Sequence, residues 1–158
     1  MLYGRFKIRI VESLMIEVRS DITKSHDRVW EELARPGARL TGEERLSVAR
    51  ELRVARNCAL CLGSKNSLSV AYDFGGHDRV DSNVPDVWIE LVHKLANDPG
   101  RIHRSWVQKL LQDGLEEVQY VEIAGLVSAV CVVDTFHEAL SLPLRPLPKS
   151  VSGAASYK

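Results

Sequence analysis

Residues 40–68 read LTGEERLSVARELRVARNCALCLGSKNSL, and this stretch decides the fold of the chain. Thr41 is followed three residues later by Glu44, which is the pattern of a capping box at the start of a helix. Apolar residues recur after it at helical spacing, at Leu46, Ala49 and Leu52. We therefore expect a helix over about 42–56, with Asn57 marking a break or the cap of a new helix.

Cys58 and Cys61 form a CxxC pair, one helical turn apart on one face, so that their sulfur atoms can meet. Two thiols at this spacing form a disulfide with little backbone movement, which suits thiol–disulfide exchange. The spacing alone leaves three interpretations open: a redox pair, half of a metal site, or two core cysteines. Zinc is the weakest, because no second CxxC and no HxxxH completes a set of four ligands. Cys131 lies in an apolar run and is predicted to be buried and inert.

The composition is that of an ordinary soluble globular domain. The chain has 158 residues, of which 45% are hydrophobic, and its 21 basic and 21 acidic side chains balance to a formal net charge of zero. We expect no nucleic-acid partner and no membrane partner, because a chain with no net charge lacks the excess of basic residues that attracts nucleic acids and anionic membranes. The longest apolar run, 123–133, is shorter than the about 20 residues of a bilayer span. With no signal-peptide pattern and three cysteines, we expect a cytoplasmic protein without cofactors.

Helical patterns cover most of the remaining chain. They predict further helices over about 26–34, 57–72, 86–96, 101–112 and 116–140. Residues 1–23 carry both a strand-like alternation at 6–10 and apolar residues at helical spacing, and we expect an N-terminal helix there. Prolines followed by small polar residues predict a flexible tail over 149–158. The sequence thus predicts a single all-α domain over 1–148, with about six or seven helices.

Several titratable residues are candidates for proton transfer to the two thiols. Glu51 lies seven residues before Cys58, on the same helical face, and Lys65 lies one turn beyond Cys61, where its charge favours the thiolate. The second half of the chain adds three candidates: His93, Tyr120 and Glu122. Each has an ordinary structural alternative, such as a solvated surface charge or a carboxylate stabilised by a helix dipole. The other histidines are predicted to take no part in a site: His26, His77, His103 and His137.

The stretch 40–68 resembles the signature helix pair of the alkylhydroperoxidase D-like, or carboxymuconolactone decarboxylase, superfamily, and residues 92–148 resemble the C-terminal half of longer members. The resemblance implies an all-α fold around an antiparallel helix pair, assembled as a homo-oligomer (dimer, trimer or hexamer). It also implies that the dithiol reduces a hydroperoxide or another small-molecule substrate, and that an external dithiol reductant resets it. The second cysteine is usually taken as the one that attacks the peroxide in that family, and here it is Cys61. A new helix that starts at Asn57 would instead favour Cys58 through its dipole, and the sequence leaves both alternatives open.

Two positions depart from the family's redox pattern, which has a Glu twelve residues before the first Cys and a His four residues after the second. Leu46 and Lys65 stand there in this chain. We expect Glu51 to replace the missing Glu as the proton relay, with His93 and Glu122 as reserves. The alternative is a non-catalytic homo-oligomeric binding member of the same superfamily, whose cysteines are vestigial.

Overall fold

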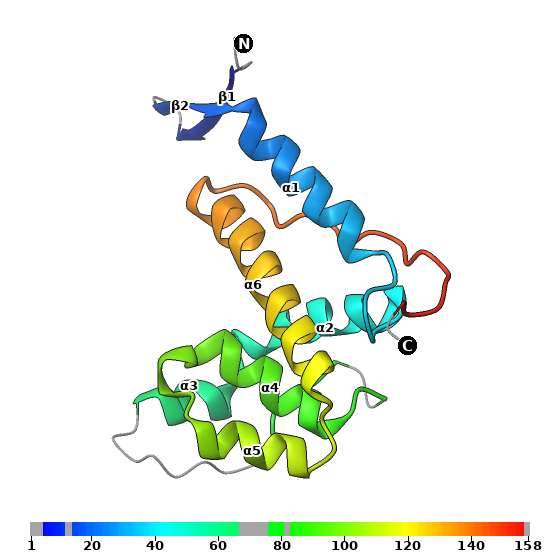
Figure 1. The fold of residues 1–158 in the computed structure, drawn as a ribbon. Helices are drawn as coiled ribbons and strands as arrows, with labels where there is room; N and C mark the ends of the chain where they lie inside the picture. Colours follow the sequence, from blue (N-terminus) through cyan, green and yellow to red (C-terminus); the bar gives the residue numbers. More distant parts are fainter. Residues whose placement is uncertain (1–4, 12–13, 67–75, 81–82, 157–158) are drawn as a thin grey trace.

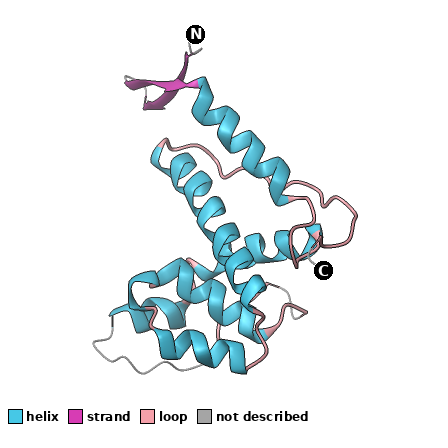
Figure 2. Ribbon diagram, in the orientation of Figure 1, coloured by secondary structure: helices cyan, strands magenta, loops and turns pink. Residues whose placement is uncertain are grey.

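Helices dominate the computed structural model, which describes residues 5–11, 14–66, 76–80 and 83–156 (Figure 1). The elements in chain order are β1 (Arg5–Val11), β2 (Leu14–Arg19), α1 (Ser20–Leu33), α2 (Gly42–Ala55), α3 (Ala59–Asn66), α4 (Asp86–Asn97), the 3₁₀ turn η1 (Pro99–Arg101), α5 (Arg104–Gln112) and α6 (Glu117–Ala139). Within the described residues this is an all-α fold with six α-helices and one small hairpin, which confirms the predicted class (Figure 2).

Most predicted helices lie where the apolar spacing placed them. α2, α4 and α6 begin and end within one residue of the predicted 42–56, 86–96 and 116–140. α1 begins six residues earlier than predicted, and the helix predicted over 101–112 is split, with η1 before α5. α3 ends at Asn66, and the rest of the helix predicted to residue 72 lies outside the described residues.

The core lies where α2, α4 and α6 pack against one another. Its fully buried side chains come from all three helices and include Leu46, Leu52, Leu91, Val92, Ile123 and Val130. α3 packs against α4 at one end of this unit. α6 is long and apolar enough to cross a membrane by length and composition alone. This is weak evidence, because a core helix passes the same test, and α6 contributes several buried residues to the core.

The capping box predicted at the start of α2 is present. Glu44 Oε2 accepts from the Thr41 N–H at 2.7 Å, and Thr41 Oγ1 accepts from the Glu44 N–H at 3.3 Å. α2 ends at Ala55, and the Cys58 N–H donates to the Ala55 carbonyl at 3.1 Å. The Cys58 carbonyl then accepts from the Leu62 N–H at 3.0 Å, which starts α3. A new helix therefore begins at the CxxC motif.

The N-terminal segment is a β-hairpin, so the prediction of an N-terminal helix is wrong for residues 5–11 and 14–19. β1 and β2 pair antiparallel, with Phe6 opposite Val18 and Ile8 opposite Ile16. β-branched and aromatic residues favour strands, and the alternation at 6–10 is the pattern that the fold follows. Cross-strand pairing is non-local, and the helical spacing of single residues does not report it.

Residues 142–156 form neither helix nor strand and run back along α1 and the loop that follows it (Figure 1). The Trp30 indole N–H donates to the Pro146 carbonyl at 2.7 Å. The backbone N–H groups of Val151 and Ser156 donate to the carbonyls of Ala34 and Gly37 at 2.8 and 2.9 Å. These bonds lay the segment on a defined path, and the predicted flexibility of 149–158 stays a prediction.

Candidate functional site

Four side chains meet at the start of α3, and we call them the thiol–imidazole cluster: Cys58, Cys61, His77 and His93. Their sulfur and nitrogen atoms all lie within 4.8 Å of one another. Cys61 Sγ lies 3.3 Å from His77 Nδ1 and 3.4 Å from His93 Nδ1, and Cys58 Sγ lies 3.8 Å from His77 Nδ1. Each imidazole thus presents its Nδ1 atom to sulfur.

Two carboxylates lie behind the imidazoles. Glu51 Oε1 is 2.8 Å from His93 Nε2, and both side chains are fully buried. Glu90 Oε2 is 3.2 Å from His77 Nε2, which is an ion-pair distance without hydrogen-bond geometry. Both rings therefore have a carboxylate on their Nε2 side and thiol sulfur on their Nδ1 side. As a result, the two Nδ1 atoms and the two sulfurs face one another.

Local structure explains how these side chains come together. Glu51 lies on the face of α2 that packs against α4, which carries Glu90 and His93. The Asn97 amide donates to the Ala55 carbonyl at 2.7 Å and so joins the C-terminal ends of α4 and α2 beside the CxxC motif. Next to His77, the Asp78 carboxylate accepts from the Ala59 N–H at 3.3 Å, which attaches the His77 loop to the first turn of α3.

The imidazoles favour the thiolate form of both cysteines. Burial raises the pKa of Cys61, but hydrogen bonds to His77 and His93 outweigh it and lower that pKa to about 6. Burial also opposes ionisation of Cys58, and its pKa is nevertheless lowered by the Cys61 backbone N–H and by His77. Cys61 is thus a thiolate at neutral pH, which is the nucleophilic form of the side chain.

The histidines shift in the opposite sense, toward the charged form. Burial lowers the pKa of His77, but contacts with Cys61, Glu90 and Cys58 raise it to about 11. Burial likewise lowers the pKa of His93, and hydrogen bonds to Cys61 and Glu51 raise it to about 9. The Cys61 sulfur and the two imidazoles stabilise one another's charges, although the charge of His77 lowers the pKa of His93, so the cluster holds thiolate beside imidazolium.

The two thiols differ in accessibility. Cys61 lines a pocket of about 30 Å³, together with His77, Glu90, His93 and Trp106. That volume accommodates a group of about the size of one water molecule. Cys58 is fully buried and is not among the residues that line this pocket. A small electrophilic atom therefore reaches Cys61 first.

Among the residues proposed from sequence, the structure brings Glu51 and His93 to the two cysteines. Lys65 is exposed on α3 and lines the same pocket as Cys61. Tyr120 is half-buried against the hydrophobic core and makes no described contact with the cluster.

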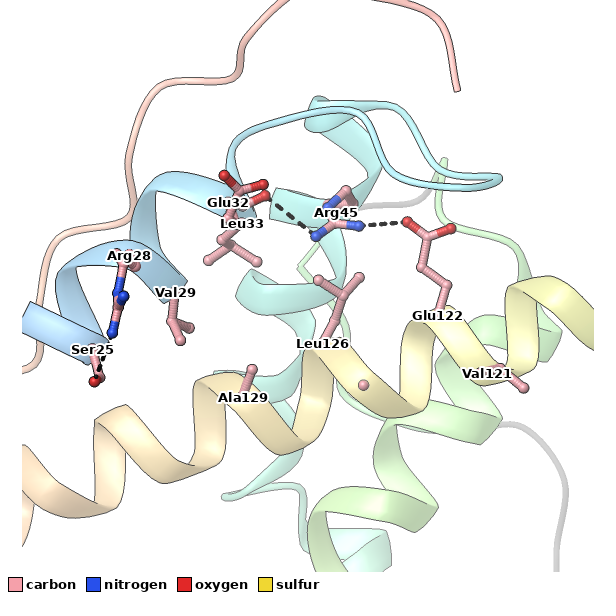
Figure 3. Close-up of a pocket in the computed structure, with 11 residues that line it drawn as sticks. Ser25, Arg28, Val29, Glu32, Leu33, Arg45, Val121, Glu122, Leu126 and Ala129 are labelled. Carbon is pink, nitrogen blue, oxygen red and sulfur yellow. Dashed lines mark hydrogen bonds and ion pairs between the residues drawn. The ribbon is translucent and has the colours of Figure 1, made fainter. Parts of the chain in front are cut away.

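Glu122 lies at a different place, in a pocket of about 530 Å³ between α1 and α6 (Figure 3). Its carboxylate accepts from Arg45 Nη1 at 2.6 Å and from the Arg39 N–H at 2.7 Å. Arg45 is in the first turn of α2, about 15 Å along the helix from Ala55 and the CxxC end. Glu122 therefore holds the loop before α2 in place, and the structure does not bring it to the thiols.

Sequence reasoning missed His77 and Glu90. His77 lies 16 residues after Cys61, and His93 lies 16 residues after His77. This C-x2-C-x15-H-x15-H spacing lacks the short His–His interval that marks familiar metal or redox motifs. Only a search that counts cysteine and histidine together over about 35 residues would have found it, and such a search carries a high rate of chance matches.

Comparisons with protein-family models, with curated proteins and with solved structures give no match for this chain.

Proposed function

We propose that this chain is a dithiol oxidoreductase that reduces hydroperoxides, of the alkylhydroperoxidase D-like type that its sequence resembles. One observation carries the proposal: the Cys61 sulfur lies within 3.4 Å of two imidazole nitrogens, at a pocket that Cys58 does not line. The imidazoles stabilise the attacking thiolate, and Cys58 is one turn away to resolve the product. The proposal includes a reducing cytoplasm, an external dithiol donor and a homo-oligomer.

The reaction proceeds in three steps. The Cys61 thiolate attacks the terminal oxygen of ROOH; the O–O bond breaks, a proton goes to the leaving alkoxide, and Cys61 sulfenic acid and ROH form. The Cys58 thiol then attacks the sulfenic sulfur, which forms the disulfide and releases water. An external dithiol reduces this disulfide by exchange and is itself oxidised, which returns both thiols.

The proton relay in this proposal differs from the one expected from sequence alone. His93 lies between Cys61 and Glu51, and its two ring nitrogens contact the sulfur at 3.4 Å and the carboxylate at 2.8 Å. Glu51 therefore acts on the thiol through His93, and not directly. His77, whose Nδ1 lies 3.3 Å from the same sulfur and whose ring centroid lies 4.3 Å from that of His93, is the second proton donor to the leaving alkoxide.

A peroxidase assay with a dithiol reductant tests the proposal, with Cys131→Ser as the matched control. Cys131 is a half-buried thiol outside the cluster, and burial raises its pKa. Wild type and Cys131→Ser should consume peroxide at equal rates, and Cys61→Ser should lose activity by more than about 100-fold. Equal rates for wild type and Cys61→Ser would overturn the mechanism.

The alternative, a binding protein with vestigial cysteines, predicts sulfur atoms that lie away from any pocket and resist thiol reagents. The position of Cys61 in the pocket that His77 and His93 line favours the redox proposal. Thiol counting in the folded protein, before and after mild oxidant, separates the two. A fast loss of two thiols per chain supports the redox pair, and full protection supports the alternative.

A further inference from the structure

We infer that the thiol–imidazole cluster is a tetrahedral binding site for Zn²⁺, with Cys58 Sγ, Cys61 Sγ, His77 Nδ1 and His93 Nδ1 as the four ligands. Two thiolates and two imidazoles form a ligand set that selects zinc, because magnesium and calcium take oxygen ligands. This inference does not rest on the peroxidase proposal, because it concerns equilibrium binding and requires no reaction at the thiols.

The distances within the cluster match the edges of a zinc tetrahedron. Zinc–sulfur bonds of about 2.3 Å and zinc–nitrogen bonds of about 2.0 Å at tetrahedral angles place sulfur and nitrogen ligands about 3.5 Å apart. Three sulfur–nitrogen separations in the cluster are 3.3, 3.4 and 3.8 Å. No pair among the four atoms exceeds 4.8 Å, so small side-chain movements complete the tetrahedron.

The contacts converge on one point and do not form a chain of separate pairs. Cys61 Sγ faces two imidazole nitrogens, and His77 Nδ1 faces two sulfurs. Two imidazolium N–H groups can both donate to the Cys61 thiolate, but this leaves Cys58 with only the longer 3.8 Å contact to His77 Nδ1. A cation at the centre satisfies all four atoms at once.

The carboxylates supply a second, independent indication of a metal. A histidine that ligates through one ring nitrogen usually donates its other N–H to a carboxylate, which sets the tautomer. Glu51 holds the Nε2 side of His93 at 2.8 Å, and Glu90 lies 3.2 Å from the Nε2 side of His77. Both rings thus have a carboxylate on the Nε2 side, so that Nδ1 is the nitrogen left to bind a metal ion beside the sulfurs. Glu51 is itself anchored by the Val80 N–H at 3.1 Å.

Zinc in this site has a defined relation to the dithiol chemistry. The metal occupies both sulfurs, so the chain forms its disulfide only when the ion leaves. Oxidation of the loaded site by ROOH with two protons yields the disulfide, ROH, water and free Zn²⁺. The zinc-bound form therefore keeps the pair reduced, and this consequence alone depends on the proposed redox function.

Cobalt substitution tests the site directly. The full chain is reduced, stripped of metal with a chelator and titrated with Co²⁺ in the absence of peroxide. We expect one Co²⁺ per chain, with the intense visible bands of tetrahedral cobalt and a near-ultraviolet thiolate-to-cobalt band, both abolished by one equivalent of Zn²⁺. The variant Cys131→Ser should behave as wild type, and His77→Ala should weaken Zn²⁺ binding by more than about 100-fold.

The outcome that overturns the inference is a wild-type protein that binds less than one Co²⁺ per chain, or binds it without a thiolate band. A wild-type protein that gains no thermal stability from Zn²⁺ overturns it too, and this measurement requires no substituted variant. Peroxidase activity is assayed separately on the chelator-treated protein. A failed metal titration with intact peroxidase activity therefore rejects zinc alone, and the reverse result rejects the peroxidase alone.

Discussion

Glu51 and Arg53 lie two residues apart on α2, and each joins a buried polar group on another helix in a different way. Arg53 forms two parallel bonds with Asp134 on α6, at 2.9 and 2.8 Å, and a third bond with the Arg145 carbonyl at 2.9 Å. Glu51 contacts His93 on α4, which in turn contacts the Cys61 sulfur.

We call the Arg53–Asp134 contact the closed pair, because both carboxylate oxygens are bonded to one guanidinium. We call the Glu51–His93 contact the open side, because it leads to atoms that can still bind a ligand. The two Asp134 oxygens are both paired to one guanidinium, so that this contact fixes α2, α6 and the C-terminal segment and leaves no group for a ligand. The Glu51 side ends in two sulfurs and two imidazole nitrogens that point at one another. The buried Arg53–Asp134 pair, whose carboxylate is fully bonded, stabilises the fold. The buried Glu51–His93 pair instead supports a set of atoms that can bind a ligand.

The largest expected effect comes from breaking the closed pair. Asp134→Ala leaves the Arg53 guanidinium without its buried carboxylate and should lower the free energy of unfolding by about 3–5 kcal/mol. Urea unfolding measures it, and Glu138→Ala is the control, since the Arg56–Glu138 pair is partly exposed and contributes about 1 kcal/mol or less. Equal losses in the two variants would show that the closed pair is not a stabilising contact.

A smaller effect is expected from the open side. Glu51→Gln keeps the shape of the side chain but removes the charge that orients His93, and should weaken Zn²⁺ binding by about 10–100-fold while the tetrahedral cobalt spectrum is retained. Glu90→Gln should have a weaker effect, because Glu90 lacks hydrogen-bond geometry to His77. Unchanged affinity in Glu51→Gln would contradict the idea that Glu51 orients His93 toward the metal.

The pH dependence of alkylation sharpens the comparison further. The pKa of Cys61 is lowered to about 6, so in the metal-free protein its reaction with an alkylating reagent should level off above about pH 7. Below pH 6 the rate should fall by about tenfold per pH unit, as the thiolate is protonated. Removal of the His77 contact in His77→Ala should move the midpoint upward. A midpoint near the ordinary thiol value in the wild-type protein would exclude the imidazole effect.

The smallest effect is expected at Lys65, the residue that sequence spacing placed beside the thiols. Its side chain is exposed, and water and salt screen its charge, so Lys65→Met should change the alkylation rate of Cys61 by less than about twofold. A change as large as that in His77→Ala would show that the Lys65 charge acts on the Cys61 thiolate.

The features of this structure that the sequence predicts are those that depend on the local spacing of residues along the chain. The capping box at Thr41, the helical spacing of α2, α4 and α6, and the CxxC pair depend on residues within one or two turns of each other. Glu51 was identified from its spacing to Cys58 along one predicted helix, although α2 ends before the cysteines and Glu51 reaches Cys61 through His93.

What the sequence did not predict depends on contacts between distant residues. His77 reaches Cys61 only because the loop before α4 folds back and Asp78 attaches it to the start of α3. The pairing of β1 with β2 is non-local in the same way. Glu122 illustrates the opposite error. Its place before the apolar run of α6 suggested a proton relay to the thiols, but its buried carboxylate is paired with Arg45 instead.

The bonds from residues 146–156 to Trp30, Ala34 and Gly37 have a consequence for how the chain matures during synthesis. Each joins residues more than 110 positions apart, so α1 and its following loop leave the ribosome long before their hydrogen-bonding partners exist. The α2–α4–α6 core is encoded between them and can form first. We expect α1 to be the last helix to acquire protection from a protease added during translation, and truncation before residue 146 to leave it accessible.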